Sequence, residues 1–398
     1  MLKRTRRSKR LIPRNLNSTE RRHRLATNQR SRPQRIVCQT QTMFRRGVTP
    51  LRLEQQMQRP RRPHLLASVL AAGLMSTAIG CAGGDAPTSA SKVTASIQGR
   101  PEGGKVRMAT GAWLGYAPLF IAQRKRLFQR EGLDAVQLRV FRSSAPIGGS
   151  LFTGQVDVAT LSSHTALRLA AQGAPITIVM QLDASRGAET LVVSKGINSL
   201  ADLKGKRIAY EELTRSDLFL RTALAAEGLS ISDVNVVPQV ASDADGARRA
   251  GRVDAAVTSE PYSSAALQQD ATAKVLLDDS TRAGLLSDCL VVRSDFLAKN
   301  PGKIAALIRA WQGGLSALED DPVGARRVVE ETLGRSIDPA AYSRVHILGI
   351  AENASFLASR YTSELSVIEK ASLAAGIVDG PVDEQALVDD RFVKEATS

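Results

Sequence analysis

The sequence predicts an α/β protein with two lobes, each a mainly parallel sheet flanked by helices. Short runs rich in Val, Ile and Leu alternate with helical patterns after residue 104, and this alternation is typical of helices that cover parallel strands. About 295 residues follow that point, which is enough for two domains with separate cores. An internal repeat indicates that the two domains are alike.

The repeat consists of three segments that recur in the same order at nearly one spacing. The pairs are GQVDVATLSS at 154–163 with GRVDAAVTSE at 251–260, QREGLDAVQLRVF at 129–141 with AAEGLSISDVNVV from 225, and, more loosely, KVRMATG at 105–111 with KRIAYEE at 206–212. We therefore expect two βαβαβ units. Lobe 1 is expected to comprise residues 105–190 and 289–398, and lobe 2 residues 191–288.

The apolar runs and helical patterns place the individual elements within the lobes. Pro118 suits the first turn of a helix that follows the first strand. A helical C-terminal tail is expected to return to lobe 1, with two hinge crossovers near 190–194 and 288–293. The expected strands are 105–109, 135–141 and 156–161, and the expected helices are 118–129, one that ends at 151–154, 218–226, 301–319, 322–333 and 340–372.

In each lobe the third strand ends in a hydroxyl-rich turn that opens a helix. The turns are LSSHT at 161–165 and TSEPY at 258–262. Ligands of open α/β sheets bind outside the carboxyl ends of the strands. Helix N-termini at that edge offer unpaired N–H groups and a partial positive charge. Two lobes that turn these edges toward one another would form a cleft.

Ahead of the lobes, HLLASVLAAGLMSTAIGCAGG at 64–84 has the features of an export signal. Its apolar run of 16 residues is short for a membrane span, which needs about 20, and is close to a signal-peptide core. Arginines precede the run, and small residues and Cys81 follow it. The end of the run resembles the lipobox of bacterial lipoproteins, in which the cysteine is lipidated. We expect a signal peptide at 57–80, lipidation of Cys81 and a flexible tether at 82–104.

The net charge of the chain is concentrated in its first part. Residues 1–63 hold 19 Lys and Arg against two Glu, whereas the residues after 63 hold 35 basic and 37 acidic side chains. The basic segment lacks apolar periodicity and the aromatics of a stacking platform, so we expect it to be disordered and expect no nucleic-acid partner. We interpret residues 1–56 as lying upstream of the true start at Met57.

Cysteine and histidine are too scarce for a metal site or a disulfide framework. The cysteines are Cys38, Cys81 and Cys289, which are spaced for neither purpose. After Cys81 the sequence contains two histidines, His164 and His346, so a zinc or iron site is not expected. We expect no metal and no cofactor.

Four blocks of the sequence resemble the solute-binding proteins of ABC importers for nitrate, taurine, aliphatic sulfonates and thiamine-type pyrimidines. The blocks are GAWLGYAPLFIAQRKRLFQREGLDAV from 111, RGAETLVVSKGINSLADLKGKRIAY from 186, GRVDAAVTSEPY from 251 and PVDEQALVDDRFVKEA from 381. The sequence departs from this family at Leu213, where glycine is common, and at Ser259, where tryptophan is common.

The resemblance implies a type II periplasmic-binding fold that closes on a small solute. It also implies an ABC permease with its cytoplasmic ATPase as partner, a monomer, and a location outside the cytosol on a lipid anchor. Relatives on the same fold include enzymes of thiamine-pyrimidine synthesis and of the menaquinone pathway. An enzyme would need a lysine for pyridoxal or clustered acid–base groups, and the cleft loops contain no lysine. We therefore expect a receptor and not an enzyme.

Uncharged candidates for the ligand site lie on the loops at the cleft edge. Aromatic side chains there could form a wall of the pocket or pack against the adjacent helix, and hydroxyl groups could cap helices and still contact a ligand. His164 could be structural or an acid–base group. These candidates are Trp113, Tyr116, Ser162, Ser163, His164, Thr214, Ser216 and Tyr262.

The charged candidates would decide the kind of solute. Arg215 and Arg186 could clamp a sulfonate or carboxylate bidentately, or could be solvated. Asp183 and Glu260 are the acidic candidates. Glu260 could instead stabilise the terminus of its own helix. If Glu260 faces the cleft, the solute is expected to bear an amine, and an arginine on the opposite side would suit a zwitterion.

Overall fold

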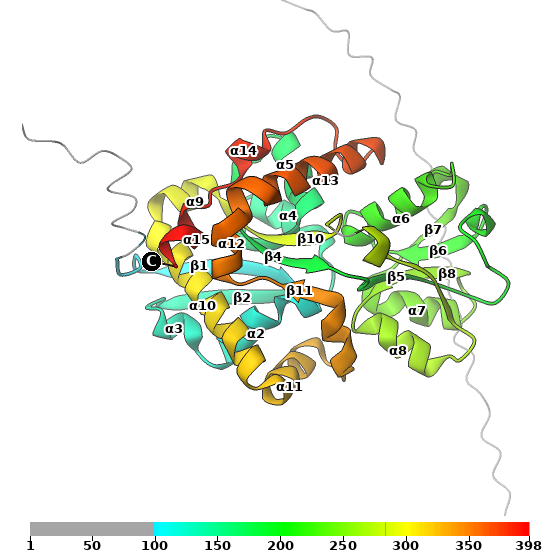
Figure 1. Cartoon of the computed structure of the whole chain (residues 1–398), viewed down its shortest axis with the longest axis horizontal. Coiled ribbons are helices and arrows are strands. Elements are labelled where there is room, and N and C mark those ends of the chain that lie inside the picture. Colours follow the sequence, from blue (N-terminus) through cyan, green and yellow to red (C-terminus); the bar gives the residue numbers. More distant parts are fainter. Residues whose placement is uncertain (1–96, 98, 283, 398) are drawn as a thin grey trace, which may run out of the picture. The chain divides into compact units, whose positions relative to one another are not determined.

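The computed structural model describes residues 97, 99–282 and 284–397 (Figure 1). The chain divides into two compact units between Gly80 and Cys81, and only the second unit contains described residues. The predictions for the basic segment, the signal peptide and Cys81 therefore lie outside the described residues. No helix in the described ranges is long and apolar enough to cross a membrane.

Two mixed sheets organise the described residues. The first sheet has the order β11-β4-β10-β3-β1-β2 and the second the order β7-β6-β8-β5-β9. The strands of the first are β1 (Lys105–Gly111), β2 (Ala135–Phe141), β3 (Val158–Ser162), β4 (Ile176–Ser185), β10 (Ser287–Arg293) and β11 (Val345–Ile347). Those of the second are β5 (Glu189–Val193), β6 (Arg207–Tyr210), β7 (Asn235–Pro238), β8 (Ala255–Ser259) and β9 (Lys274–Asp278).

One strand in each sheet, β5 or β10, runs antiparallel to its neighbours because it comes directly from the other sheet. Strand β1 pairs in parallel with β2 and β3, and β6 with β7 and β8. Strands β5 and β10 are antiparallel to both of their neighbours. Each of these two strands enters its sheet directly from the other sheet. A chain that leaves one carboxyl edge and enters the facing edge must run in the opposite sense, and so both sheets are mixed and not mainly parallel.

Helices cover both faces of each sheet. The second sheet carries α6 on one face and α7 and α8 on the other (Figure 1). A small alanine-rich cluster packs under α7, apart from the larger core. The α-helices are α2 (Ala117–Arg124), α3 (Leu127–Arg130), α4 (Ala145–Phe152), α5 (Ser163–Ala171), α6 (Arg215–Ala225), α7 (Ala241–Arg249), α8 (Tyr262–Gln269), α9 (Ser294–Lys299), α10 (Pro301–Asp320), α11 (Pro322–Leu333), α12 (Ile350–Phe356), α13 (Thr362–Ala374), α14 (Glu384–Leu387) and α15 (Arg391–Glu395).

The structure differs from the expected elements in three places. The helix expected at 118–129 is split into α2 and α3, because Arg126 has φ 56°, which an α-helix does not accommodate. The helix expected at 340–372 contains β11, whose three residues are too few to show an alternating pattern. The crossovers run from Ser185 to Glu189 and from Asp278 to Ser287, slightly before the expected positions.

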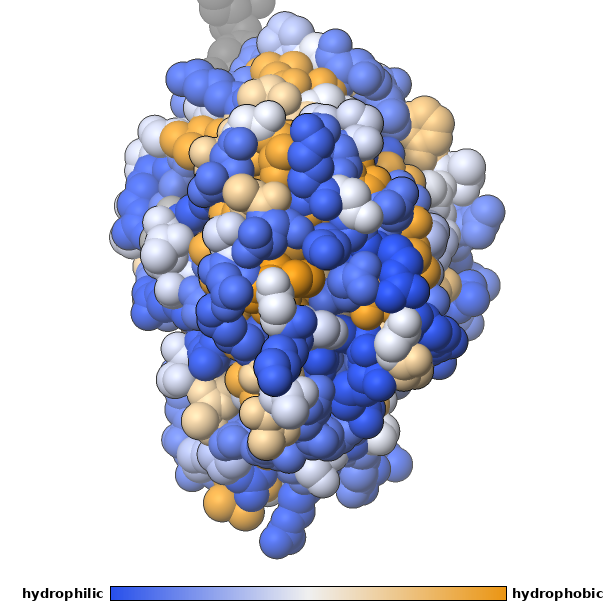
Figure 2. Space-filling model, turned by 90° about the vertical axis from the view of Figure 1, so that its right-hand side faces the viewer, coloured by the Kyte–Doolittle hydropathy of each residue, from blue (hydrophilic) through white to orange (hydrophobic). Residues whose placement is uncertain are grey.

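The outer surface of the lobe that contains the second sheet is largely hydrophilic. Figure 2 shows hydrophobic side chains there in small separate groups among hydrophilic ones. The larger core instead draws buried apolar residues from both sheets, among them Met108, Val179 and Leu191. The two lobes therefore share one apolar core. The polar strand ends are available to form a site.

The repeated Gly-x-Val-Asp segment forms the same clamp in each lobe. Asp157 Oδ2 accepts hydrogen bonds from the backbone N of Arg107 at 3.0 Å and from its Nε at 2.9 Å. Asp254 Oδ2 accepts the equivalent bonds from Arg207 at 2.9 and 3.1 Å. These clamps align Arg107 with Arg207, which corrects by one residue the loose match of 105–111 with 206–212. The two segments are short and similar in composition, so the sequence alone could not fix their alignment to one residue.

Replacing Asp157 is expected to destabilise the protein more than replacing Asp254. The Asp157 side chain is 6% exposed and that of Asp254 is 32% exposed. Water can therefore replace the lost acceptor less well for the Arg107 donors in Asp157→Ala than for the Arg207 donors in Asp254→Ala. We expect Asp157→Ala to lower the free energy of unfolding by about 1–3 kcal/mol and Asp254→Ala by about 1 kcal/mol or less. Urea unfolding of both variants measures this difference, and equal losses would contradict it.

Candidate functional site

A cavity of about 50 Å³ lies between the strand ends of the two sheets. Its lining comes from both lobes. The residues from the side of the first sheet are Ala112, Trp113, Tyr116, Arg142, Ser144, Thr160, Leu161, Ser162, Thr165 and Asp288. Those from the side of the second sheet are Glu189, Glu211, Leu213, Thr214, Arg215, Ser216, Ala241, Ser242, Ser259 and Tyr262.

The structure brings seven of the twelve predicted ligand-site residues to this lining. They are Trp113, Tyr116, Ser162, Thr214, Arg215, Ser216 and Tyr262. The other five lie outside the lining: Ser163, His164, Asp183, Arg186 and Glu260. The lining therefore unites loops that are about 150 residues apart in the sequence, and it adds acidic residues that the sequence did not single out.

Trp113 is held in place by Asp183. The indole Nε1 donates to Asp183 Oδ2 at 2.9 Å, beneath the short helix η1 (Leu114–Tyr116). Gly115 permits this approach, because a Cβ there would lie 2.1 Å from Asp183 Oδ2 and 2.3 Å from the indole nitrogen. Asp183 is fully buried, and burial followed by the charge of Asp288 raises its pKa well above the ordinary value. Asp183 thus supports the aromatic wall from behind.

Arg215 occupies the centre of the site and connects the two lobes. It begins α6 on the second lobe, and its Nη2 donates to Asp288 Oδ2 of β10 at 2.8 Å. Its guanidinium carbon lies 3.6 Å from the centroid of the Trp113 ring, a cation–π contact. Burial acts to lower the pKa of Arg215, but the charges of Asp288, Asp183 and Glu189 raise it. The arginine is therefore neither solvated nor free of carboxylate partners.

Glu189 is the second acidic group at this centre. It is fully buried at the start of β5, and its Oε1 accepts a hydrogen bond from Ser216 Oγ. Its Oε2 lies 3.8 Å from Arg215 Nε and has no hydrogen-bond partner among the described residues. Burial raises the pKa of Glu189 to about 8, although Arg215 and Ser216 act to lower it.

Glu189 and Asp288 are the functional candidates that sequence reasoning missed. Each stands at the start of the strand that follows a crossover, in the segments AETLVV and SDCLVV. An acidic residue directly before a buried apolar strand is unusual, because a buried carboxylate needs a partner. This pattern was the signal that could have identified both residues.

The hydroxyl and imidazole candidates behind the lining have structural contacts. Ser163 Oγ lies 2.7 Å from Ser287 Oγ and 2.8 Å from the Tyr361 hydroxyl, all buried. Burial, followed by the charges of Arg168 and Arg215, lowers the pKa of His164 to about 3. The neutral, buried imidazole fits the structural alternative for His164.

Two positions at the cavity mark the departures from the resembled family. Leu213 has φ 61°, a left-handed conformation that glycine adopts without strain, and its side chain lines the cavity. Ser259 ends β8 and also lines the cavity. A leucine that adds volume and a serine where tryptophan is common change the cavity walls on the second lobe.

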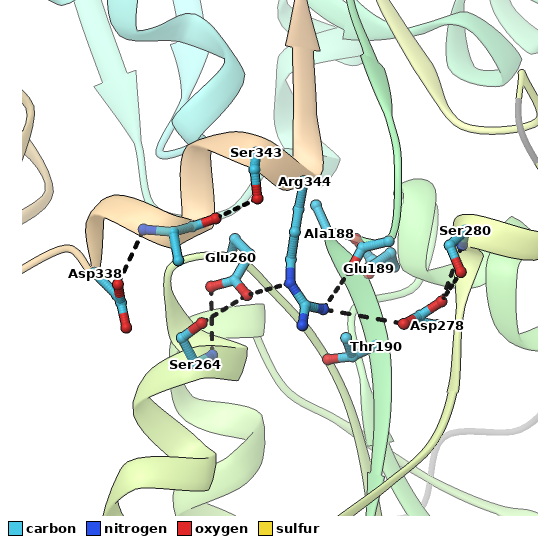
Figure 3. A network of polar contacts seen from close by, with 12 residues as sticks. Ala188, Glu189, Thr190, Glu260, Ser264, Asp278, Ser280, Asp338, Ser343 and Arg344 are labelled. Atoms are coloured by element: carbon cyan, nitrogen blue, oxygen red, sulfur yellow. Dashed lines mark hydrogen bonds and ion pairs between the residues drawn. The ribbon is translucent and has the colours of Figure 1, made fainter. Parts of the chain in front are cut away.

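Arg186 and Glu260 lie outside the lining, and Glu260 belongs to a polar network at the crossovers (Figure 3). The Arg186 side chain is exposed, and its backbone N donates to Arg344 O at 2.8 Å. Glu260 Oε1 accepts from Ser264 Oγ at 2.8 Å and lies 3.6 Å from Arg344 Nε. Glu260 therefore stabilises the first turn of its own helix α8, as one of the two alternatives expected.

Arg344 joins this network to the first crossover. It ends the short helix η5 (Pro339–Arg344), and its Nη1 donates to Gly187 O at 2.9 Å. The same Nη1 lies 4.0 Å from Asp278 Oδ2, where β9 leads into the second crossover. One side chain from the C-terminal region thus contacts both connections between the sheets.

Removing the Arg344 charge is expected to expose a coupling with Glu260. Arg344→Gln leaves the buried Glu260 carboxylate without its nearby cation, so we expect a loss of about 1–3 kcal/mol in the free energy of unfolding. In Arg344→Gln/Glu260→Gln the orphaned charge is gone, and the loss should fall short of the sum of the single losses by about 1 kcal/mol. Chemical denaturation of the four proteins tests this, and strictly additive losses would refute the coupling.

Comparisons with known proteins show a family and several similar proteins. The family described as NMT1/THI5 like matches residues 113–325. The chain is 30% identical to the taurine-binding periplasmic protein of Escherichia coli over 48% of this chain and 60% of that protein. It is 25% identical to the 4-amino-5-hydroxymethyl-2-methylpyrimidine phosphate synthase of Schizosaccharomyces pombe over 52% of this chain and 63% of that protein. The chain thus spans less than two thirds of the length of these relatives.

The solved structures establish the fold. The alkanesulfonate-binding protein SsuA from Xanthomonas axonopodis pv. citri bound to MOPS superposes with a TM-score of 0.61 at 20% identity, over 73% of this chain and 99% of that one. The predicted periplasmic-binding fold of two α/β lobes is confirmed.

Proposed function

Because the chain belongs to the NMT1/THI5-like family, we propose that it is the substrate-binding protein of an ABC importer. In this proposal it captures a small polar solute between its lobes and delivers it to a permease with its cytoplasmic ATPase. The observation that carries the proposal is the cavity lined from both sheets. A ligand that contacts both lobes favours the arrangement in which they are close.

Contacts at the rim of the cavity support a cleft that closes. The backbone N of Ser144 donates to Glu211 Oε1 at 3.0 Å, and Arg142 Nη2 lies 2.8 Å from Asp243 Oδ1. Both contacts join the first lobe to the second, and the Arg142 side chain is 73% exposed. Exposed ion pairs contribute little stability, so rim contacts of this kind can break and re-form as a solute enters and leaves.

The relatives suggest a range of solutes. The named relatives bind taurine and an alkanesulfonate, and a synthase of a phosphorylated pyrimidine is also similar. We propose a solute of the sulfonate, taurine, nitrate or nitrogenous pyrimidine type. The seven predicted residues that line the cavity are proposed to contact it, with Asp183 positioning Trp113.

The alternative is an enzyme on the same fold. The similarity to the synthase is the observation that supports this alternative. The cavity lining among the described residues contains no lysine, histidine or cysteine. Those side chains commonly supply covalent attachment or proton transfer. The lining does contain the carboxyl groups of Glu189 and Asp288, which can transfer protons, so the fate of the bound solute decides between receptor and enzyme.

Binding is expected to be visible through Trp113. The sequence contains two tryptophans; Trp113 lines the cavity, whereas Trp311 is buried in α10 and donates to Leu348 O at 2.8 Å. A solute should change the fluorescence of the wild type but not of Trp113→Phe. At a hundredfold excess over Kd it should also add about 2.7 kcal/mol of stability. Recovery of the solute in a converted form would instead establish the enzyme.

We propose further that the mature protein is a monomeric lipoprotein held outside the cytosol by Cys81. The support is the order of arginines, apolar run and cysteine at 57–81, and lipoproteins that carry two or more chains attach stably to membranes. Mass spectrometry of the native protein should find an acylated N-terminus at Cys81, and Cys81→Ser should release the protein from membranes. A mature species that retains Arg4 to Arg52 would overturn this proposal.

A further inference from the structure

On the basis of the proposed function, we propose that the solute carries a protonated amine or amidine group that binds to Glu189. The buried centre of the cleft contains three carboxyl groups, those of Asp183, Glu189 and Asp288, and a single guanidinium, that of Arg215. The proposal follows from this excess of acceptors and from how each charged group is already engaged.

Two of the three nitrogens of the Arg215 guanidinium already face carboxyl groups. Its Nη2 is bound to Asp288 at 2.8 Å, its Nε faces Glu189 at 3.8 Å, and one face of the group lies against Trp113. An oxyanion without a cationic group would have to displace Asp288 from Nη2 or bind at Nη1 alone. The other arginine of the lining, Arg142, is exposed at the rim and paired with Asp243.

An unpartnered acceptor points to a donor on the solute. Glu189 is 0% exposed and lines the cavity, and its Oε2 has no hydrogen bond within the described residues. Leaving a buried acceptor unsatisfied is costly, and hydrogen bonds to charged groups are among the stronger ones. An ammonium or amidinium N–H would donate to Oε2 in the ionised form of Glu189.

Arg215 adds a second requirement. Its Nη1 is also buried and has no hydrogen-bond partner among the described residues. A solute with an acceptor next to its cationic nitrogen would satisfy Nη1 and Glu189 Oε2 together. The cavity of about 50 Å³ has room for about three to five water-sized groups, so the part that enters is small.

The sequence predicts an amine-bearing solute if Glu260 faces the cleft. In the structure the acid that faces the cavity is Glu189. Glu260 is turned toward Ser264 and Arg344 and lies outside the lining. Glu189 stands on the neighbouring strand, with its Cα paired to that of Ser259, and faces the cavity. The two acids are one strand apart, equally buried and differently engaged, which makes them a matched pair for experiment.

Binding of a cation to Glu189 should be linked to proton release. The groups that face its carboxyl are Arg215 and Ser216 of α6, Asp279 of the second crossover and Asp288 of β10. Because burial raises the pKa of Glu189 to about 8, the free site is mostly protonated at neutral pH. A cation needs the ionised form, so its affinity should increase with pH up to about 8, by up to about tenfold per unit. An oxyanion would show the opposite trend.

Calorimetry on the mature protein with small probes tests the proposal. The probes are ethylamine, acetamidine and taurine, which carry the cationic group, and ethanesulfonate and nitrate, which do not. We expect binding of the first set only, with affinity that rises from pH 6.5 to 7.5. Glu189→Gln should weaken that binding about 10- to 100-fold, whereas the matched Glu260→Gln should leave it within about threefold.

The outcomes separate this inference from the proposed function. Tight binding of ethanesulfonate or nitrate, unaffected by Glu189→Gln, would overturn the cationic solute and leave the receptor standing. Conversion of an amine probe would overturn the receptor, while the Glu189→Gln result would still decide the role of Glu189. Affinity of the amine probes that falls as pH rises would overturn the inference without any variant, so a poorly folded Glu189→Gln does not block the test.

Discussion

One buried guanidinium, that of Arg215, sets the arrangement of the whole cleft. It starts a helix of the second lobe, and its charge partner Asp288 and stacking partner Trp113 belong to the first. A charge in this position requires partners, because burying it alone costs far more than a folded domain can supply. The carboxylates, the indole and the helix start must therefore meet at one point, and this requirement fixes how the two strand edges face each other.

The topology explains where those carboxylates come from. Each crossover delivers the chain to the middle of the opposite sheet, and an acidic residue stands at the start of the entering strand, Glu189 in β5 and Asp288 in β10. The same segments that connect the lobes thus supply the charged floor of the cavity. The Arg344 network touches both connections from outside. Connections and cavity are consequently parts of one polar system, and a solute bound as proposed would lie close to both connections between the lobes.

Much of this architecture could be predicted from the sequence, because it depends on local pattern. The bounds of β2 and α11 coincide with the expected ones, and the repeated Gly-x-Val-Asp segments mark β3 and β8. Residues on the loops, such as Trp113, could be placed at the cavity because strand ends are predictable. The roles of Glu189 and Glu260 could not. They stand on adjacent strands, and only the packing of Arg344 and Arg215 decides which acid faces the cavity.

The paired aspartate clamps have a consequence for movement. Asp157 and Asp254 stand at the amino ends of β3 and β8, away from the cavity. Through its carbonyl oxygen each also accepts a backbone N–H at the far end of the strand that enters from the other lobe. Asp157 accepts from Arg293, the last residue of β10, at 3.1 Å, and Asp254 accepts from Ser194, which follows β5, at 3.0 Å. The incoming strand is therefore fastened at its far end to the aspartate clamp of the repeat unit. If the lobes close as proposed, each would move as a rigid body, with the bending confined to the short connections between β4 and β5 and between β9 and β10.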